Sequence, residues 1–408
     1  MTLRLLLILG GLSAFGPLAI DLYLPAFPSI ATFFATDSEH VQLSLSAYFI
    51  GLALGQLFYG PLADRFGRRK PLLFGLALFT LASIGCALAP TLEWLIAARF
   101  AQALGGCAGM VVNRAIVRDI CTPIQAARAF SQLMLVMGVA PILAPLAGGW
   151  LMLLGGWQLI FSFLAVFSGL FGLLVFFRLP ETLSRDTPPS QLSSALGRYG
   201  RLLVEPQFMF HALTGGIAMA GMFAYIAGSP FVFIELYGVP VEHYGWLFGM
   251  NSAGFVLAAQ LNSRLLRWRT PLNVLKTTTV LFMFSTIALS LVAMFEPPTL
   301  WPLLVPLFIC IFLTALVLPN SSACALAGQG HQAGVASALM GTLQFAIAGI
   351  ISAMVGMLHN GTALPMTGMI TLCGIGSAAM ALLARRVTAP AADSRLFAQQ
   401  TQAVEDNQ

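Results

Sequence analysis

The stretch Gly60-Pro-Leu-Ala-Asp-Arg-Phe-Gly-Arg-Arg-Lys70 joins two long apolar segments, residues 41–60 and 71–90. It carries four cations and one carboxylate in a connection too short to form a domain of its own. A short basic connection between two membrane spans is typical of a loop on the cytoplasmic side. The stretch therefore predicts a pair of transmembrane helices and the side on which they are joined.

Within this loop, we expect Pro61 to break the first helix. Gly60 and Gly67 allow the helix ends to lie close together and allow a positive φ. The single carboxylate is expected to pair with one of two nearby arginines: Asp64 with Arg65 or Arg68.

The composition predicts an all-α membrane protein. The chain is 58% hydrophobic and 9% charged, with a mean hydropathy of +0.87, far more apolar than a water-soluble fold of this length requires. Several apolar segments exceed the ~20 residues that cross the hydrocarbon, so we expect tilted helices or helices broken at Pro or Gly. Twelve transmembrane helices are predicted, at residues 5–31, 41–62, 71–90, 94–117, 124–154, 157–178, 207–232, 243–264, 271–295, 299–326, 332–357 and 363–385.

The charges support this count. Of the 20 Lys and Arg residues, two lie inside the fourth span, Arg99 and Arg114. The other 18 fall on one side of the membrane if both termini are cytoplasmic, and the opposite loops carry only carboxylates. The isoelectric point near 9.0 follows from these anchors and does not indicate a nucleic-acid partner. The carboxylates of the opposite loops are Asp37, Glu39, Glu93, Glu235, Glu242 and Glu296.

A polar interruption at residues 179–205 divides the chain into two groups of six spans. In the second group, Leu261-Asn-Ser-Arg-Leu-Leu-Arg267 matches Leu62-Ala-Asp-Arg-Phe-Gly-Arg68 in register, with Ser263 in place of the carboxylate. Two parallel six-helix repeats with a substrate site between them are therefore expected. The predicted domains are an N-terminal bundle, a central cytoplasmic loop, a C-terminal bundle and a cytoplasmic tail, at residues 1–178, 179–205, 206–388 and 389–408.

Other kinds of site find little support in the sequence. The N-terminal apolar run continues to residue 31 without a convincing cleavage site, so we expect a retained span and not a signal peptide. The sequence has no Gly-x-x-x-x-Gly-Lys-[Ser/Thr], which argues against ATP as the energy source. No metal-binding or nucleophile pattern occurs, and the cysteines are scattered singly: Cys86, Cys107, Cys121, Cys310, Cys324 and Cys373.

The opening stretch resembles the cytoplasmic loop between helices 2 and 3 of the major facilitator superfamily, a large group of secondary transporters. In the fifth span, Gly138-Val-Ala-Pro-Ile-Leu-Ala-Pro-Leu-Ala-Gly-Gly149 resembles the antiporter motif of the drug/proton antiporters in that superfamily. A kinked, closely packed structural helix explains the same residues. The residues of this motif with a conformational role by resemblance are Gly138, Pro141, Pro145, Gly148 and Gly149.

Three further segments resemble the bicyclomycin-resistance/chloramphenicol-efflux branch: Asp21-Leu-Tyr-Leu-Pro-Ala-Phe-Pro28, Arg114-Ala-Ile-Val-Arg-Asp119 and Pro180-Glu-Thr-Leu183. This resemblance implies a proton-coupled exporter of antibiotics or related small molecules in a bacterial inner membrane. It implies no cofactor beyond the proton gradient, and we expect a monomer whose partners are the substrate, protons and the lipid bilayer.

Asp21 is the one acidic residue placed well inside a span. An ionised carboxylate there is costly unless it is paired or protonated. Arg99 in the fourth span lies at a similar depth, since both residues are ~8–15 Å from the outer end at 1.5 Å per residue. We therefore expect Asp21 and Arg99 to form a pair that carries proton coupling. A static buried salt bridge and a position of Asp21 at the water interface are the alternatives.

Asp64 and Arg68 are expected to form a cytoplasmic latch whose ion pairs hold the outward-facing state together, with a solvated loop as the alternative. The loop residues assigned to this latch are Gly60, Asp64, Arg65, Gly67 and Arg68. Arg114 either lines the inner vestibule or snorkels to the interface. A drug site should be apolar and aromatic with few polar groups. The candidate substrate contacts, each equally explained by helix packing, are Tyr23, Tyr48, Asn113, Met134, Met137, Tyr225, Asn251, Asn320 and Gln344.

Three rival functions remain. An exporter of a natural metabolite, such as an amino acid or a nucleobase, has the same sequence features as a drug exporter. An intramembrane enzyme should show several catalytic side chains at membrane depth, where this chain has one carboxylate. A channel would conduct without an obligatory proton step.

Overall fold

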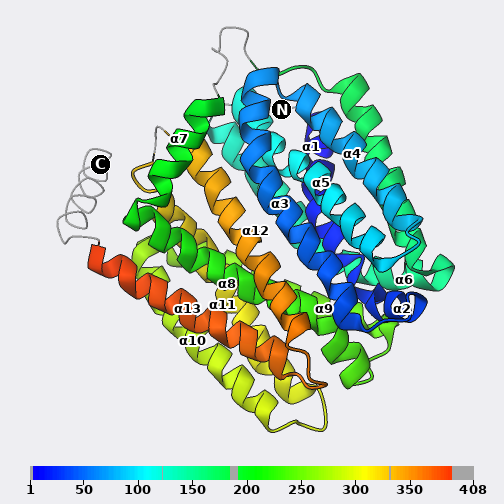
Figure 1. Ribbon diagram of the computed structural model, residues 1–408. Helices are drawn as coiled ribbons and strands as arrows, with labels where there is room; N and C mark the ends of the chain where they lie inside the picture. Colours follow the sequence, from blue (N-terminus) through cyan, green and yellow to red (C-terminus); the bar gives the residue numbers. More distant parts are fainter. Residues whose placement is uncertain (1–2, 122, 184–191, 330–331, 388–408) are drawn as a thin grey trace.

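The computed structural model describes residues 3–121, 123–183, 192–329 and 332–387, and all regular elements in these ranges are helical (Figure 1). Within residues 3–178 and within residues 206–387, the long helices are separated by connections of a few residues. In chain order the elements are α1 (Leu3–Asp21), η1 (Leu24–Ala26), α2 (Phe27–Phe33), α3 (Ser38–Phe66), α4 (Arg69–Ala87), α5 (Leu92–Ile120), α6 (Pro123–Arg178), α7 (Leu192–Leu203), α8 (Pro206–Pro230), η2 (Phe231–Leu236), α9 (Val241–Leu265), α10 (Pro271–Met294), α11 (Trp301–Leu326), α12 (Ala333–Met357) and α13 (Leu364–Val387).

The helices confirm the twelve predicted spans. Ten described segments are long and apolar enough to cross a membrane. One of them, Gly138–Arg178, is 41 residues long, and its backbone leaves helical geometry at Gly155 and Gly156. The glycine pair therefore divides α6 into two crossings. α9 supplies the twelfth, because its 25 residues are long enough although it is less apolar than the others.

The helices form two bundles that lie side by side in Figure 1, α1–α6 and α8–α13. Two antiparallel helix pairs join the bundles: α3 packs on α12, and the first crossing of α6 packs on α9. We call the surface along these two pairs the inter-half interface. It places residues far apart in the sequence next to one another, as expected for two packed repeats.

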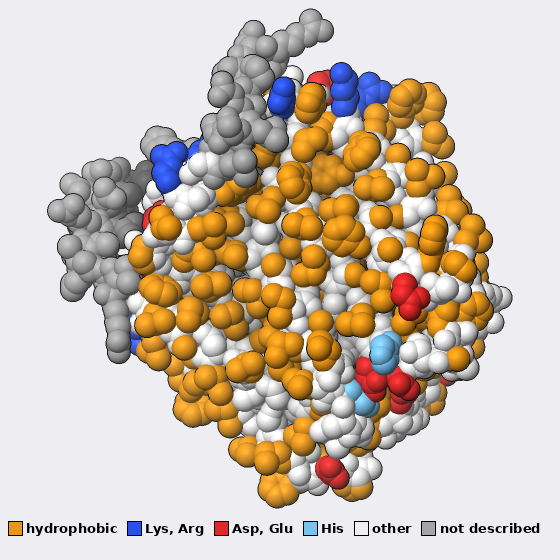
Figure 2. Space-filling view, viewed as in Figure 1, with side chains coloured by type: hydrophobic (Ala, Val, Ile, Leu, Met, Phe, Trp, Pro, Cys, Tyr) orange, Lys and Arg blue, Asp and Glu red, His pale blue; other side chains and the backbone are white. Residues whose placement is uncertain are grey.

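Charge separates the two ends of the molecule. Figure 2 shows Lys and Arg side chains along the top, a broad hydrophobic belt, and acidic and His side chains toward the lower right. We call the end with Arg65 and Arg68–Lys70 the basic end, and the end with Asp37 and Glu39 the acidic end. The belt between them is the surface that a multi-pass membrane protein presents to lipid.

The first span is broken near its proline residues, as expected for so long a segment. α1 ends at Asp21, the 3-10 turn η1 contains Pro25, and α2 begins at Phe27 with Pro28 in its first turn. Asp21 therefore lies at the end of one helix and not in the middle of a continuous one.

One prediction about the opening stretch is wrong: Pro61 does not break α3, which continues to Phe66. A proline in a helix leaves the carbonyl four residues earlier without its N–H donor. That carbonyl belongs to Leu57, and the hydroxyl of Tyr199 on α7 donates to it at 3.4 Å. Gly60 is helical with open space around its Cα, so the expected close contact and positive φ are absent there. The turn itself is reduced to Gly67 and Arg68.

Candidate functional site

Asp21 is buried at the inter-half interface, with 4% of its surface exposed. Tyr225 of α8 and Tyr244 of α9, both in the second bundle, lie close enough to Asp21 to sense its charge. The Tyr225 hydroxyl accepts a hydrogen bond from Asn251 Nδ2 at 3.1 Å. The structure therefore brings together three residues that the sequence analysis selected separately: Asp21, Tyr225 and Asn251.

The expected ion pair between Arg99 and Asp21 is absent, although both residues are described. The Arg99 side chain is fully buried in an aromatic box. Its guanidinium carbon lies 4.2 Å from the ring centroid of Tyr48, 4.8 Å from that of Tyr23 and 5.7 Å from that of Phe161. Nη1 donates to the side-chain oxygen of Gln102 at 2.5 Å. The faces of aromatic rings thus contact the Arg99 guanidinium, where the Asp21 carboxylate was expected.

The direction of the side chains explains why the expected pair is absent. Tyr23 contacts Arg99, and Asp21 lies two residues before it at the end of α1. Residues two apart on a helix do not face the same way. Asp21 consequently faces the second bundle while Tyr23 faces α5, although both lie near the depth that the sequence analysis expected.

The span-5 motif forms the part of the interface next to Asp21. A Cβ at Gly148 would collide with the carbonyl oxygen of Leu22, and a Cβ at Gly245 would lie 2.7 Å from Leu146. The glycines on α6 and α9 therefore allow α1, α6 and α9 to approach closely. The other motif residues are within α6: Gly138 is next to Val256, Gly149 is next to Val241, and Pro141 and Pro145 are accommodated inside the helix.

Polar contacts join the two bundles at the acidic end. Glu39 of α3 lies 3.0 Å from Nε2 of His359, which follows α12. Gln42 donates to the carbonyl of Ser352 at 2.7 Å, and the Ser38 hydroxyl donates to Glu235. The bundles are therefore held together at this end.

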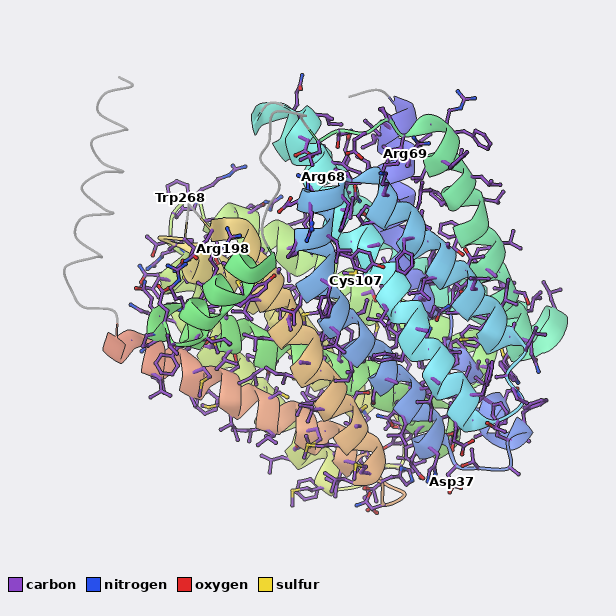
Figure 3. The ribbon with its side chains drawn as sticks, turned by 45° about the horizontal axis from the view of Figure 1, so that its top comes forward. Asp37, Arg68, Arg69, Cys107, Arg198 and Trp268 are labelled. Atoms are coloured by element: carbon purple, nitrogen blue, oxygen red, sulfur yellow. The ribbon has the colours of Figure 1, made fainter. Side chains whose placement is uncertain are left out.

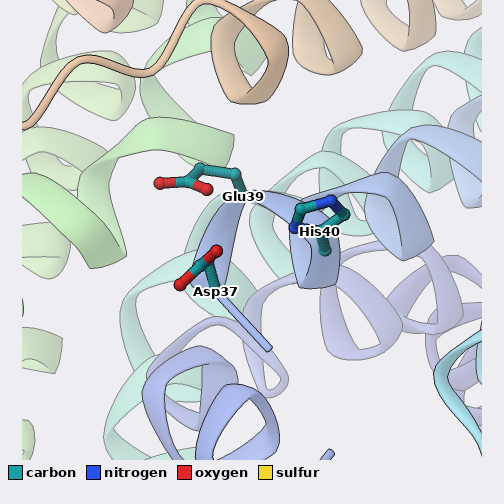
Figure 4. A group of neighbouring side chains, drawn as sticks. All are labelled: Asp37, Glu39 and His40. Atoms are coloured by element: carbon teal, nitrogen blue, oxygen red, sulfur yellow. The ribbon is translucent and has the colours of Figure 1, made fainter. Parts of the chain in front are cut away.

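Asp37, Glu39 and His40 form a small cluster beside these contacts (Figure 4), with one ligand atom of each residue within 4.8 Å of the others. Three such donors can in principle hold a metal ion. Two of the three are exposed, and Glu39 is already paired with His359. Exposed donors of this kind do not by themselves indicate a metal site.

At the basic end, Arg68 is buried where the ends of α3, α4 and α5 meet (Figure 3). Its Nη1 lies 2.5 Å from Asp64 Oδ1, which is the expected ion pair. Its Nε lies 2.8 Å from Asp119 Oδ2 and forms a second ion pair. Arg65 does not pair with Asp64; its guanidinium stacks on the Phe66 ring, 5.3 Å from the centroid. The ion-pair network therefore ties helices of one bundle together.

Gly67 closes this turn and has the predicted positive φ, +86°. A side chain there would collide with the carboxylate of Glu181, from the Pro180-Glu-Thr-Leu183 segment. Partial burial favours the neutral Glu181 carboxyl, but hydrogen bonds from backbone N–H groups outweigh it and hold the pKa of Glu181 below its usual value. The donors lie at 2.7–3.2 Å and belong to Arg68, Arg69, Thr182 and Leu183.

Replacing Glu181→Gln is expected to lower the unfolding temperature at pH 7 by ~2 °C, because charge-assisted hydrogen bonds to the turn are lost. The pKa is lower in the folded protein, so the stabilisation is complete above the unfolded value of about 4.3 and disappears as pH falls through the folded value. Thermal unfolding of both proteins across that pH range measures this difference. Glu242→Gln, at an exposed Glu, should show no such effect; equal pH profiles for the two variants would contradict the assignment.

The remaining candidates mostly make contacts within one bundle. Asn113 donates to Leu9 O and Ser13 Oγ, and Asn320 donates to Asn262 Oδ1. These are interhelical hydrogen bonds, as the packing alternative expects. Tyr23 and Tyr48 belong to the Arg99 box, and Gln344 packs against Gly216. The side chains of Met134 and Met137 lie outside the described residues.

Sequence reasoning missed three residues with clear roles in this geometry: Gln102, Asp119 and Tyr244. Gln102 is three residues from Arg99 on the same helix, a spacing that places the two side chains together. Asp119 was part of a quoted motif but was given no role. Tyr244 offered no sequence signal, because only the packing of α9 on the first bundle, mainly on α6, brings it near Asp21.

The comparisons with known proteins agree with this architecture. The sequence model of the Major Facilitator Superfamily matches residues 8–353 of this chain. The chain belongs to that superfamily. As a facilitator it is a membrane transporter, and the resemblance read from the sequence motifs is confirmed.

Two relatives and one solved structure illustrate the relation of this facilitator to known proteins. It is 40% identical over 381 residues to the uncharacterized MFS-type transporter YdgK of Bacillus subtilis (strain 168), covering 92% of this chain and 94% of YdgK. It is 30% identical over 373 residues to the bicyclomycin resistance protein homolog of Haemophilus influenzae, covering 91% and 94%. Its fold matches a bacterial homolog of the human lysosomal transporter Spinster, solved in an inward-facing and occupied conformation, with a TM-score of 0.71 and 16% identity over 93% of this chain and 96% of that one.

Proposed function

We propose that this facilitator exports antibiotics or related small molecules across the bacterial inner membrane in exchange for protons, by alternating access. The observation that carries the proposal is the position of Asp21, a buried carboxyl group at the inter-half interface without a cation partner among the described residues. The relation to a bicyclomycin resistance protein homolog supports drugs as the substrate class.

Asp21 is placed where a proton can be coupled to movement of the two bundles. It belongs to the first bundle, and Tyr225 and Tyr244 belong to the second. Separation of the bundles would admit water to the carboxyl group, and their closure would remove that water. Since burial opposes an ionised carboxylate, the closed interface should hold Asp21 protonated, and opening should let the carboxyl group exchange a proton with the water that enters.

The two ends of the molecule suggest which state is present. The contacts of Glu39, Gln42 and Ser38 hold the bundles together at the acidic end. With the acidic end outside the cell, this is a state closed to the outside in the proposed cycle. In this scheme the Asp64–Arg68–Asp119 network keeps the basic ends of α3, α4 and α5 in one rigid unit, and its role as a latch of the outward-facing state stays a prediction.

The proposal keeps the predicted organisation of the chain: a bundle of residues 1–178, a central loop of 179–205, a bundle of 206–388 and a tail of 389–408, of which 388–408 lies outside the described residues. One chain contains both halves of the interface, so a monomer is sufficient for transport. No cofactor other than the proton gradient is required in this scheme.

The function is tested by transport into inverted membrane vesicles with an imposed pH gradient, screened across antibiotics and across amino acids and nucleobases. Accumulation of an antibiotic that stops when the gradient is collapsed supports the proposal. Gradient-driven accumulation of a metabolite alone would assign the protein to metabolite export. Transport that is indifferent to the pH gradient would exclude proton exchange.

The orientation is tested with single cysteines in a background from which the six native cysteines are removed. Cysteines at Thr36 and Pro297, at the acidic end, should react with an impermeant thiol reagent added outside the cell. Cysteines at Arg201 and Arg267, at the basic end, should react only after the reagent is admitted to the inside. Labelling with the opposite sidedness would invert the proposed topology.

A further inference from the structure

A groove runs along the outside of the first bundle, between α3 and α4. Both helices pack mainly on α5 and touch each other little, so Leu104 of α5 forms the floor between them. The groove has a volume of about 560 Å³, within the ~300–1,000 Å³ of sites that hold small ligands. Its walls are apolar and include Phe58, Leu62 and Phe66 of α3 and Phe74 and Leu78 of α4.

The groove has the length of one membrane leaflet. It extends from Phe66 to Gly55 on α3 and from Lys70 to Leu78 on α4. At 1.5 Å per residue these segments are ~16 Å and ~12 Å long. The hydrocarbon of a bilayer is ~30 Å thick, so each leaflet contributes about half of that. A single acyl chain that enters at the basic end would therefore fill the groove to its far end.

Two cations stand at the basic end of this groove. Lys70 lines it and is exposed, and the guanidinium of Arg65 lies over the ring of Phe66. Neither cation takes part in an ion pair with a described residue. The nearest carboxylate along α3 is that of Asp64, and it is already bound to Arg68. The entrance of an apolar groove thus carries unpaired positive charge at the level of lipid headgroups.

We propose that this groove is a binding site for one anionic phospholipid. The acyl chain lies against Phe58, Phe74 and Leu104, and the phosphate is held by Lys70 and Arg65. An apolar channel combined with unpaired cations at a helix end matches both parts of such a lipid. A zwitterionic lipid satisfies the apolar walls equally well but gains less from the two cations.

Native mass spectrometry of the delipidated full-length protein tests the site. The protein is titrated with phosphatidylglycerol and with phosphatidylethanolamine that carry the same acyl chains. One phosphatidylglycerol should bind more tightly than all later ones and more tightly than phosphatidylethanolamine. Lys70→Gln should weaken this first binding about fivefold and Arg65→Gln/Lys70→Gln about 25-fold, the effect of one and two juxtamembrane cations. Arg267→Gln, which removes an exposed basic-end charge after α9 in the second bundle, should change nothing.

Filling the groove provides an independent test of the acyl-chain part. Leu78→Trp should remove the first, tight binding step, whereas Leu372→Trp, on the exposed face of α13, should keep it. Unfolding temperatures of both variants without added lipid show whether each is folded. Equal affinity for the two lipids, no effect of Lys70→Gln, or tight binding that persists in a folded Leu78→Trp protein would each overturn the proposal and leave only non-specific boundary lipid.

Discussion

The Asp21→Asn protein should insert and fold but lose transport driven by a pH gradient, so that substrate uptake is the same with and without the gradient. Asn has nearly the size of Asp and can make similar hydrogen bonds, but it cannot bind and release a proton. Asp21 is buried beside Tyr225 and Tyr244, so the variant keeps the packing of the interface. Only the step that couples a proton to opening of the interface is removed.

The measurement is uptake into proteoliposomes with and without an imposed pH gradient, together with downhill exchange of labelled substrate. Downhill exchange should survive in Asp21→Asn, because a neutral side chain does not prevent movement of the bundles. Asp37→Asn is the matched control, since it makes the same change at an exposed carboxylate of the acidic end. Gradient-driven transport by purified Asp21→Asn protein would remove Asp21 from the proton pathway.

The sequence predicted the helices well because lipid imposes a simple requirement on them. A crossing needs a minimum apolar length and polar ends, and both can be read locally. The tenth helix agrees closely, with residues 271–295 predicted and Pro271–Met294 observed. α3 was predicted to end near residue 62 because the effect of Pro61 was judged from local rules. The donor that completes the helix there is Tyr199, about 140 residues away, and no local rule includes it.

The site was less predictable, because depth along a helix does not determine direction around it. The sequence placed Asp21 and Arg99 at similar depth, and the two are buried near the acidic side of their helices as expected. Their partners come from α3, α6, α8 and α9, which assemble only in the tertiary structure. The Arg99 guanidinium contacts aromatic rings, and the Asp21 carboxyl group lies near tyrosines of the second bundle. Local reasoning had instead paired these two residues with each other.

The aromatic box makes Arg99 the side chain with the largest expected effect on stability. Arg99→Ala should destabilise the protein by about 3–5 kcal/mol, since it empties a buried site of this size and leaves Gln102 without its partner. Arg99→Lys keeps the charge but not the flat guanidinium that lies between the rings of Tyr48 and Tyr23. We therefore expect Arg99→Lys to be clearly less stable than the parent protein as well.

Double-mutant cycles distinguish the box from the ion pair that the sequence suggested. The coupling free energy between Arg99→Ala and Tyr48→Leu should be about 2 kcal/mol, the size of a desolvated cation–π contact. The coupling between Arg99→Ala and Asp21→Asn should be within ~0.5 kcal/mol of zero, because the residues share no contact in this state. Reversible unfolding in mixed micelles of increasing SDS content measures both. A strong coupling of Arg99 to Asp21 with none to Tyr48 would contradict the aromatic box and show that the ion pair dominates. Arg99 would then act on the proton site directly and not through the packing of Tyr23 beside it.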